Sequence, residues 1–459
     1  MSAELKQNAA TGAPASCWKP YPAYRDSGVE WLGKVPEHWE VKRLKWISYI
    51  NPVKSNSKFD KNSEDLVTFL PMEKVSEDGK IDIEIKKPIK DLWNGFTYFE
   101  ENDIIVAKIT PCFENGKGAL IKNLGSKVGF GSTEFHVLRP KENIIKELLY
   151  YLTKSDIFMK LGEASMTGAA GQKRVTNSFL EDFFICYPKD IGKQKSISLF
   201  LDDRTRKIDS LIEKKQKMIE LLKEERAAVI NQAVTKGLNP DAPMKDSGIE
   251  WLGEVPEHWK VKKLKYVAEV VLGKMLTSDD KGGYFYKPYL RAQNIGWQKV
   301  NADDIKQMWF SEKELEQYRV KLNDLLVSEG GEVGRTAIWK NIIEECYIQN
   351  SVHKVTMLDG NNPHYFLYLF FLYGQMGYFD SIVSRVSIAH LTREKLKEVF
   401  CLIPSIGEQK HIVKLIELES AKIDSAVSII EKELLLLQEY RTALISEIVT
   451  GKIDVREAT

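Results

Sequence analysis

The chain contains the same sequence frame twice. Residues 26–45 read DSGVEWLGKVPEHWEVKRLK, and residues 246–265, shifted by 220 positions, read DSGIEWLGEVPEHWKVKKLK. A second pair of segments, 191–238 and 406–453, matches at a shift of 215 and includes IGKQK against IGEQK and VTKG against VTGK. Repeats of this length indicate duplicated domains rather than solenoid units. The order is A–x–B–A–x–B with unlike x segments, which predicts one scaffold that presents two different readers.

Each B segment predicts a single long helix. Neither 194–235 nor 408–450 contains a proline or a glycine, and some forty residues of helix would span roughly 60 Å. Apolar residues recur at steps of three, four or seven, which is a heptad seam, although Lys215 and Arg226 interrupt the first seam and Arg441 occupies the equivalent of Arg226. We expect the two helices to pack on each other antiparallel; the alternative is that each packs on its own domain. The seam residues are Ile208, Ile212, Ile219, Leu222, Val229, Ile423, Val427, Ile430, Leu434, Leu437, Leu444 and Ile448.

The x segments predict mixed domains of the α+β class. Short β-type runs such as 66–70, 103–107 and 135–138 are bounded by glycine and proline, and a helical pattern follows over 144–161. The second half repeats this order, and NDLLVS matches NDIIVA of the first half at a shift of 221. The predicted fold is therefore two pseudo-symmetric α/β domains joined by two long antiparallel coiled-coil helices. The expected parts are a disordered lead-in (1–23), a first domain (24–190), a central helix (191–238), a second domain (239–405) and a C-terminal helix (406–459).

Composition predicts a cytoplasmic protein without a membrane segment. Five cysteines lie far apart with no CxxC pair, which fits a reducing compartment. The most apolar run, 365–373, is far shorter than the ~18 residues of a spanning helix, so a buried element is expected there. The net charge is +1, so any binding to nucleic acid must use local patches.

No complete catalytic or metal-ligating motif is present. The segment 28–35 approaches a phosphate-binding loop, but Val35 replaces the required hydroxyl residue and the second copy has Glu254 in place of the lysine. Asp103–Lys108 could belong to a nuclease core, yet its copy carries Ser328 and Glu329, so a structural strand is the preferred interpretation. We assign no catalytic residue and no metal ligand.

The repeated frame resembles the specificity subunit of type I restriction–modification systems. The resemblance is carried by WLGKVPEHW and WLGEVPEHW, by IGKQK and IGEQK, and by the long helices that end in VTKG and VTGK; it covers residues 24–459. It implies two target-recognition domains that each read one half of a bipartite, asymmetric site in double-stranded DNA. It also implies helices that set the spacing and dock two copies of a methyltransferase subunit, with motor-nuclease subunits joining the complex.

The same resemblance implies that this subunit is non-catalytic and binds no cofactor. S-adenosylmethionine, magnesium and ATP would be used by the partner subunits of an adenine-N6 methyltransferase and ATP-dependent endonuclease. Two readers on one face of a duplex must lie about one helical turn apart, roughly 34–36 Å, and a helix of the predicted length exceeds that distance.

Donor-rich loops are the candidates for DNA contact, because Arg, Lys, Asn and Gln read base edges and bind phosphates. The basic triplets at 42–45 and 262–265 are repeated, which suggests a phosphate or subunit contact or a plain solvated face. The candidate readers in the first domain are Lys108, Lys117, Gln172, Lys173, Arg174 and Asn177. Those in the second domain are Arg291, Gln293, Asn294, Arg335, Gln349, Asn350, Arg385 and His390.

A different class of function remains open at this point. A coiled-coil scaffold or adaptor with two protein-binding modules would share the duplicated helices, and the near-zero net charge fits it. A self-contained methyltransferase or nuclease is disfavoured by the missing motifs. Salt distinguishes the first two hypotheses, because a duplex binder loses affinity steeply as salt rises.

Overall fold

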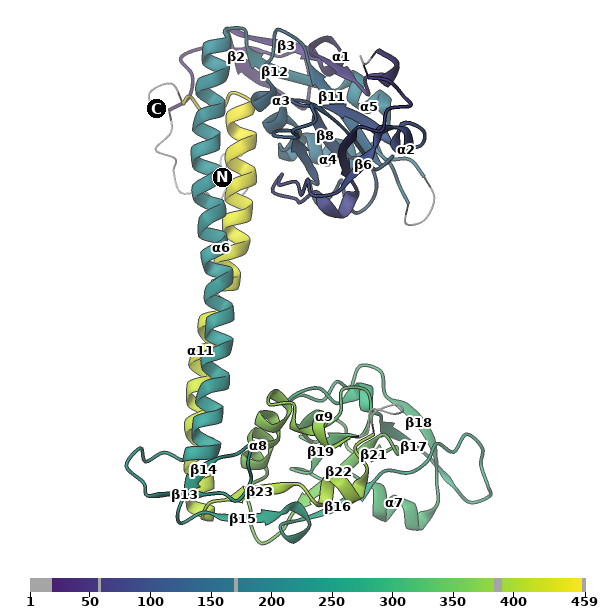
Figure 1. Ribbon diagram of the computed structural model, residues 1–459, viewed down its shortest axis with the longest axis vertical. Helices are drawn as coiled ribbons and strands as arrows, with labels where there is room; N and C mark the ends of the chain where they lie inside the picture. The colour runs from purple at the N-terminus through teal and green to yellow at the C-terminus, as the bar shows by residue number, and fades with distance from the viewer. Residues whose placement is uncertain (1–18, 57–58, 169–171, 384–389, 456–459) are drawn as a thin grey trace, which may run out of the picture. The chain divides into compact units, whose positions relative to one another are not determined.

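The computed structural model describes residues 19–56, 59–168, 172–383 and 390–455. The chain forms two compact units, Met1–Lys215 with Glu431–Thr459 and Gln216–Ile430. Both cuts fall within the long helices, at positions related by the 215-residue shift of the sequence repeat. Each unit is described by itself (Figure 1).

The first unit contains two four-stranded sheets. One sheet has the order β4, β11, β8, β9 and the other has the order β6, β5, β10, β7, in which β5 and β10 run parallel. The strands of the first sheet are Ser48–Ile50 (β4), Phe135–Pro140 (β11), Ile104–Ala107 (β8) and Gly118–Leu120 (β9). Those of the second are Lys86–Pro88 (β6), Leu66–Leu70 (β5), Val128–Gly131 (β10) and Thr97–Glu100 (β7).

Short helices and small two-stranded sheets complete the first unit. The pairs β1 with β2 and β3 with β12 are antiparallel. The strands are Tyr24–Asp26 (β1), Lys34–Pro36 (β2), Trp39–Arg43 (β3) and Phe184–Pro188 (β12), and the helices are Leu44–Ile47 (α1), Ile89–Trp93 (α2), Lys146–Thr153 (α3), Asp156–Ala164 (α4) and Asn177–Asp182 (α5).

The second unit repeats this plan. Its four-stranded sheet has the order β16, β22, β19, β20, and its three-stranded sheet has the order β18, β17, β21, with β17 and β21 parallel. These strands are Ala268–Leu272 (β16), Val352–Met357 (β22), Leu325–Ser328 (β19), Thr336–Ile338 (β20), Lys306–Phe310 (β18), Phe285–Leu290 (β17) and Tyr347–Ile348 (β21). The small pairs are Met244–Asp246 (β13) with Glu254–Pro256 (β14), and Lys260–Lys263 (β15) with Phe400–Ile403 (β23).

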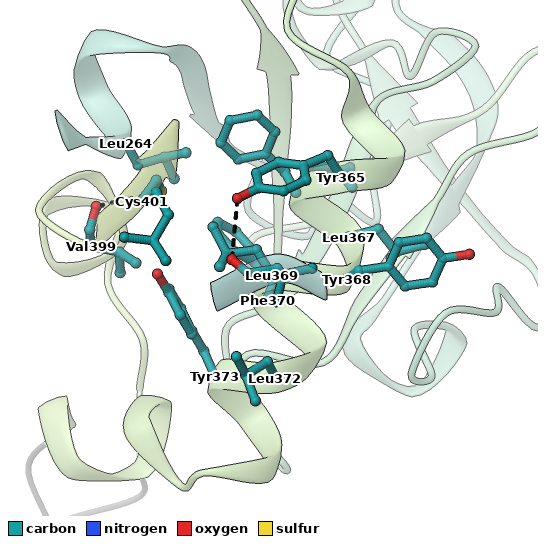
Figure 2. Packing of buried hydrophobic residues seen from close by; sticks show 14 of the residues in the cluster. Leu264, Tyr365, Leu367, Tyr368, Leu369, Phe370, Leu372, Tyr373, Val399 and Cys401 are labelled. Atoms are coloured by element: carbon teal, nitrogen blue, oxygen red, sulfur yellow. Dashed lines mark hydrogen bonds between the residues drawn. The ribbon is translucent and has the colours of Figure 1, made fainter. Parts of the chain in front are cut away.

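The apolar run of the second half forms the buried helix α8, Pro363–Gln375, as the sequence predicts; α7 (Glu312–Tyr318), α9 (Tyr378–Ile382) and α10 (Arg393–Lys397) are shorter. Figure 2 shows Tyr365 and Tyr373 of α8 within the apolar cluster. Their hydroxyls donate to the carbonyls of Val234 (3.4 Å) and Phe400 (2.9 Å), which satisfies the polar end of each buried ring.

The B segments form α6, Ile191–Lys236, and α11, Ile406–Val449. In the first unit Arg441 binds Asp209 (Nε–Oδ1 2.8 Å), and in the second Arg226 binds Asp424 (Nη1–Oδ1 3.3 Å). In the first unit Lys215 also binds Glu433 (2.6 Å), and in the second Glu408 of α11 lies beside Gly237, directly after α6. Within each unit the partner numbers on α11 therefore fall as those on α6 rise, so the helices are antiparallel in both. All twelve seam residues are buried or half-buried.

The predicted α+β class with two related domains and two long antiparallel helices is confirmed. One detail differs. Disorder is expected to residue 23, and residues 1–18 lie outside the described residues, but Tyr21 is buried against Trp39 (ring centroids 5.7 Å). Trp39 and Trp259 are buried at equivalent positions of the two A segments, whereas Trp46 is 64% exposed.

Candidate nucleic-acid interface

The predicted DNA-reading loop of the first domain, residues 166–177 (MTGAAGQKRVTN), is described apart from 169–171, and its last residues return along the end of β8. The amide of Val175 donates to the carbonyl of Lys108 (2.8 Å), and the amide of Thr110 donates to the carbonyl of Lys173 (3.1 Å). Lys108 in turn donates its amide to Glu134 O (2.9 Å), at the start of β11. Because these bonds are made by the backbone, the positions of the loop ends do not depend on which side chains they carry.

Five candidates of the first domain therefore lie around one end of the sheet. Lys117 is next to Lys108, since Ala107 N donates to Lys117 O (2.9 Å), while Lys173 and Arg174 lie on the opposite segment. Asn177, at the start of α5, accepts a hydrogen bond from Asn51 Nδ2 (3.0 Å). Gln172 is exposed beside residues 169–171, which lie outside the described residues.

Arg174 is exposed but paired in this structure. Its Nε and Nη2 donate to the two carboxylate oxygens of Glu134 (3.0 and 2.7 Å). Hydrogen bonding from Arg174 lowers the pKa of Glu134, and the charge of Lys108 lowers it further. A planar guanidinium held in this bidentate way is oriented, and the same donors match a phosphate or a guanine edge.

The second domain has the same backbone arrangement at the same end of its sheet. The amide of Glu329 donates to Ser351 O (2.9 Å), and Leu391 N donates to Glu329 O (2.8 Å). Gln349 N donates to Leu290 O (3.0 Å), as Ser132 N does to Leu70 O (3.1 Å) in the first domain.

The candidates of the second domain gather around this backbone frame. Arg291 Nη2 and Gln293 Nε2 both donate to Asp304 Oδ2 (2.9 and 3.2 Å). Arg335 Nη2 donates to Ala292 O (3.1 Å). The side chains of Gln349 and Asn350 are bonded to each other (Nε2–Oδ1 2.6 Å).

His390 is exposed and faces Glu329. Burial raises the pKa of Glu329, and His390 opposes part of that rise. Glu329 occupies the position of Lys108 in the first domain, so the two frames carry opposite charges at this point. Arg385 lies outside the described residues.

Asn294 is a correction to the expected set. It is only 2% exposed, and its Nδ2 donates to Asn301 O (2.9 Å) while its Oδ1 accepts from Arg291 N (2.9 Å). Its side chain is therefore used to close the turn after β17 and is not presented at the surface. Its segment, LRAQNI at 290–295, follows a strand end, and the sequence gives no sign that the asparagine is buried.

The repeated basic triplets are partly neutralised by acids at equivalent places. Arg43 and Lys45 bind Asp182 (3.0 and 3.2 Å), and Lys263 and Lys265 bind Glu398 (2.6 Å each). The two lysines lower the pKa of Glu398 to about 2. Each unit thus carries two cations around one anion, a feature that belongs to the shared frame.

Several residues of these sites were not found by sequence reasoning. Glu134, Asp304 and Glu329 orient or oppose the predicted cations, and an acidic residue in a loop gives no local signal of that role. His136 and His353 were also missed, although both follow the first residue of equivalent strands, β11 and β22. Their equivalence at a shift of 217 is the signal that could have identified them.

The chemistry of both sites is that of hydrogen bonding and charge. Within the described ranges, no three or more His, Cys, Asp or Glu side chains are grouped so as to hold a metal ion. A search of the same residues finds no helix with the length and apolar character needed to cross a bilayer.

Two domains with one backbone plan and unlike polar side chains at the same end define a duplicated recognition protein. Comparison with known proteins gives its family. Residues 36–221 and 256–432 match the type I restriction modification DNA specificity domain. The chain therefore belongs to the family of type I restriction–modification specificity subunits.

Individual relatives match over different extents. The EcoAI specificity subunit of Escherichia coli is 44% identical over 159 residues, which is 34% of this chain and 26% of that protein; the chain thus spans about a quarter of that relative's length. The MjaVIII specificity subunit of Methanocaldococcus jannaschii is 26% identical over 438 residues, 92% of this chain and 95% of that protein. A chain solved in a study of complex assembly and conformational transition of the type I R-M system has the same fold, with a TM-score of 0.72 at 16% identity over 91% of this chain and 99% of that chain.

Proposed function

We propose that each domain reads one half of a bipartite, asymmetric DNA site. The observation that carries this proposal is the pair of equivalent backbone frames with unlike side chains. Lys108, Ser132 and Glu134 occupy the positions of Glu329, Gln349 and Ser351. A lysine donates to guanine or phosphate, a glutamate accepts from cytosine, and a glutamine pairs with adenine, so the two domains favour different half-sites.

The long helices are proposed to hold the two readers at a fixed spacing. Helix α6 is continuous over 46 residues, and the ion pairs Arg226–Asp424 and Arg441–Asp209 fix its antiparallel register with α11 in each unit. A helix of this length, roughly 70 Å, exceeds the 34–36 Å between successive turns of one groove. Readers on such a spacer would engage one face of a duplex.

We also propose that equivalent residues of the two helices dock two copies of one methyltransferase subunit. A groove of about 550 Å³ is lined by Thr442, Ala443 and Ser446 of α11 together with the start of α4. A second groove of about 210 Å³ is lined by the equivalent residues of α6, 227, 228 and 231, together with the end of α8. A repeated surface would give two similar docking places in one chain, each for one methyltransferase subunit.

In this proposal the chain itself is non-catalytic. The methyltransferase subunits would bind S-adenosylmethionine, and motor-nuclease subunits would use magnesium and ATP. The recognition domains would then decide only where those activities are applied.

Methylome sequencing of cells that express this chain with its methyltransferase subunits tests the proposal. We expect adenine methylation at a split sequence with two short, unlike halves. Methylation at one short continuous sequence would contradict it. Replacing residues 51–190 with the corresponding segment of another specificity subunit should change only one half of the methylated sequence, whereas a change in both halves would exclude one domain per half-site.

A further inference from the structure

Each domain contains one buried histidine at an equivalent position. His136 of β11 is 3% exposed and His353 of β22 is fully buried. They lie 217 positions apart and on the same face of equivalent strands, since their neighbours Val137 and Val352 pack into clusters on the opposite face. Nothing in the apolar interior requires an imidazole at these positions, so their contacts must explain them.

Both imidazoles bind the carbonyl of a residue that directly follows a candidate reader. His136 Nε2 is 2.9 Å from Val175 O, and His353 Nε2 is 2.6 Å from Leu391 O. A carbonyl oxygen only accepts, so Nε2 carries the proton in both residues and each ring is a neutral donor. Desolvation lowers the pKa of both histidines to about 4, which keeps the rings in this form at neutral pH.

Val175 and Leu391 are each held by two backbone hydrogen bonds, one made by the amide and one by the carbonyl. The amides of Val175 and Leu391 donate to Lys108 O and Glu329 O (2.8 Å each), and their carbonyls accept from the two histidines. Both residues are buried, 2% and 0% exposed. Lys173 and Arg174 directly precede the first of them, and His390 directly precedes the second.

In the first domain His136 also contacts Asn51, which binds the candidate reader Asn177. Asn51 Nδ2 lies 3.3 Å from His136 Nδ1 and 3.0 Å from Asn177 Oδ1. Since Nδ1 carries no proton, it accepts from Asn51. His136 therefore connects the end of the reading loop, through Asn51, to a candidate reader at the start of α5.

We propose that His136 and His353 are positioning residues that fix the backbone beside a candidate base reader in each domain, Arg174 in the first and His390 in the second. The inference rests on the proposed function, because it assigns the loops of the two domains to the two halves of a DNA site. A bidentate contact between a side chain and a base depends on a fixed geometry. Loss of the imidazole frees the carbonyl of Val175 or Leu391 and allows the adjacent reader, Arg174 or His390, to shift, so the domain discriminates less between matched and mismatched half-sites.

The test uses the chain assembled with its methyltransferase subunits. Methylation rates are measured on duplexes that carry the target sequence and on duplexes with one substituted base pair in either half. For His136→Leu we expect discrimination to fall about tenfold in one half only, and His353→Leu should produce the same loss in the other half only.

Three control variants separate positioning from stability. Val137→Ala removes buried volume from the adjacent residue of the same strand without touching the loop, and it should lower the yield of active complex without changing discrimination. Val352→Ala is the matched control in the second domain. His136→Gln retains an N–H donor near the position of Nε2, and we expect it to restore most of the discrimination that His136→Leu loses.

Three outcomes would overturn the inference. They are unchanged discrimination in both leucine variants, equal loss in both halves, or the same loss in the valine controls. Arg174→Ala distinguishes this failure from failure of the proposed function. If Arg174→Ala alters discrimination in one half and the histidine variants do not, the loop reads DNA without the histidine; if the parent complex methylates no split sequence, the proposed function itself fails.

Discussion

Asp103 shows how one buried side chain settles a role that the sequence left open. Its carboxylate is 1% exposed and receives Arg139 Nε and Nη2 (2.8 Å each). In the second domain Asp324 accepts from Thr356 Oγ1 (2.6 Å). Burial raises the pKa of both aspartates, and their partners satisfy the oxygens that desolvation would otherwise leave unpaired. Asp103 in the segment 103–108 is therefore a buried structural residue, as the strand interpretation of this segment predicts.

At the residue scale, the two buried histidines predict an acid-sensitive fold. Their pKa values are lowered from 6.5 to about 4, so below pH 6.5 the unfolded chain binds more protons than the folded chain. Stability is then present above pH 6.5 and is lost as the pH falls towards 4, by about 1.4 kcal/mol per pH unit for each histidine. The charges near the rings are Lys108 and Glu134 for His136, and Arg393 and Glu394 for His353.

Urea unfolding between pH 7 and pH 5 measures this loss. The double variant His136→Gln, His353→Gln should show a smaller decrease in unfolding free energy over that interval than the parent chain, even if it is less stable at pH 7. Equal decreases in the two proteins would show that other groups cause the acid sensitivity.

At the element scale, the charged residues that interrupt the helical seams each form an ion pair with the opposite helix. Arg226–Asp424 and Arg441–Asp209 are the same ion pair in two copies, because their residues are related by the shift of 215. Lys215, the third interruption, binds Glu433 (2.6 Å). A charged residue at an apolar seam specifies alignment at some loss of stability, and here it specifies the antiparallel register.

We predict a measurable coupling between Arg441 and Asp209. A double-mutant cycle with Arg441→Ala and Asp209→Ala should give about 1 kcal/mol, the upper part of the range for partly exposed pairs. Lys207–Asp203, an i,i+4 pair on the same helix (2.8 Å), is the matched control and should give less than about 0.5 kcal/mol. Unfolding free energies of the parent, the two single variants and the double variant in each cycle supply both values. Equal coupling energies for the two pairs would show that the seam pair has no special role in alignment.

The helices could be predicted from sequence and much of the site could not. A proline-free segment with heptad spacing determines a helix from local information alone. Pairing of β5 with β10 depends on contacts between residues far apart in the chain, which no local pattern contains. The same limit applies to Asp304, whose effect on Arg291 and Gln293 arises only when the turn after β17 closes, and to Asn294, whose burial depends on that turn.

For the whole molecule, a net charge of +1 means that attraction to a duplex must be local. The first-domain site brings Lys108, Lys117, Lys173 and Arg174 together with Glu134, whereas the second-domain site places Asp304 and Glu329 among its cations. We therefore expect the first domain to provide more of the phosphate contacts and the second to rely more on hydrogen bonds to bases.

Salt dependence tests this division. When the assembled complex binds its target duplex between about 50 and 200 mM salt, Lys108→Gln with Lys173→Gln should reduce the log–log slope of affinity against salt by about 2, because each lysine that is removed leaves about one phosphate unneutralised. Arg335→Gln in the second domain should reduce discrimination between sequences more than it changes the slope. A slope that is unaltered by the lysine changes would show that these residues do not neutralise phosphates.

The backbone hydrogen bonds at the reading end of each domain also determine which substitutions the fold tolerates there. Main-chain atoms hold that end together, from Lys108 and Val175 in one domain to Glu329 and Leu391 in the other. Substitutions on this surface can therefore accumulate without unfolding the domain beneath it. If each domain reads one half-site as proposed, such a protein can acquire a new target one half at a time, while the few interior groups that keep the surface in place must be retained.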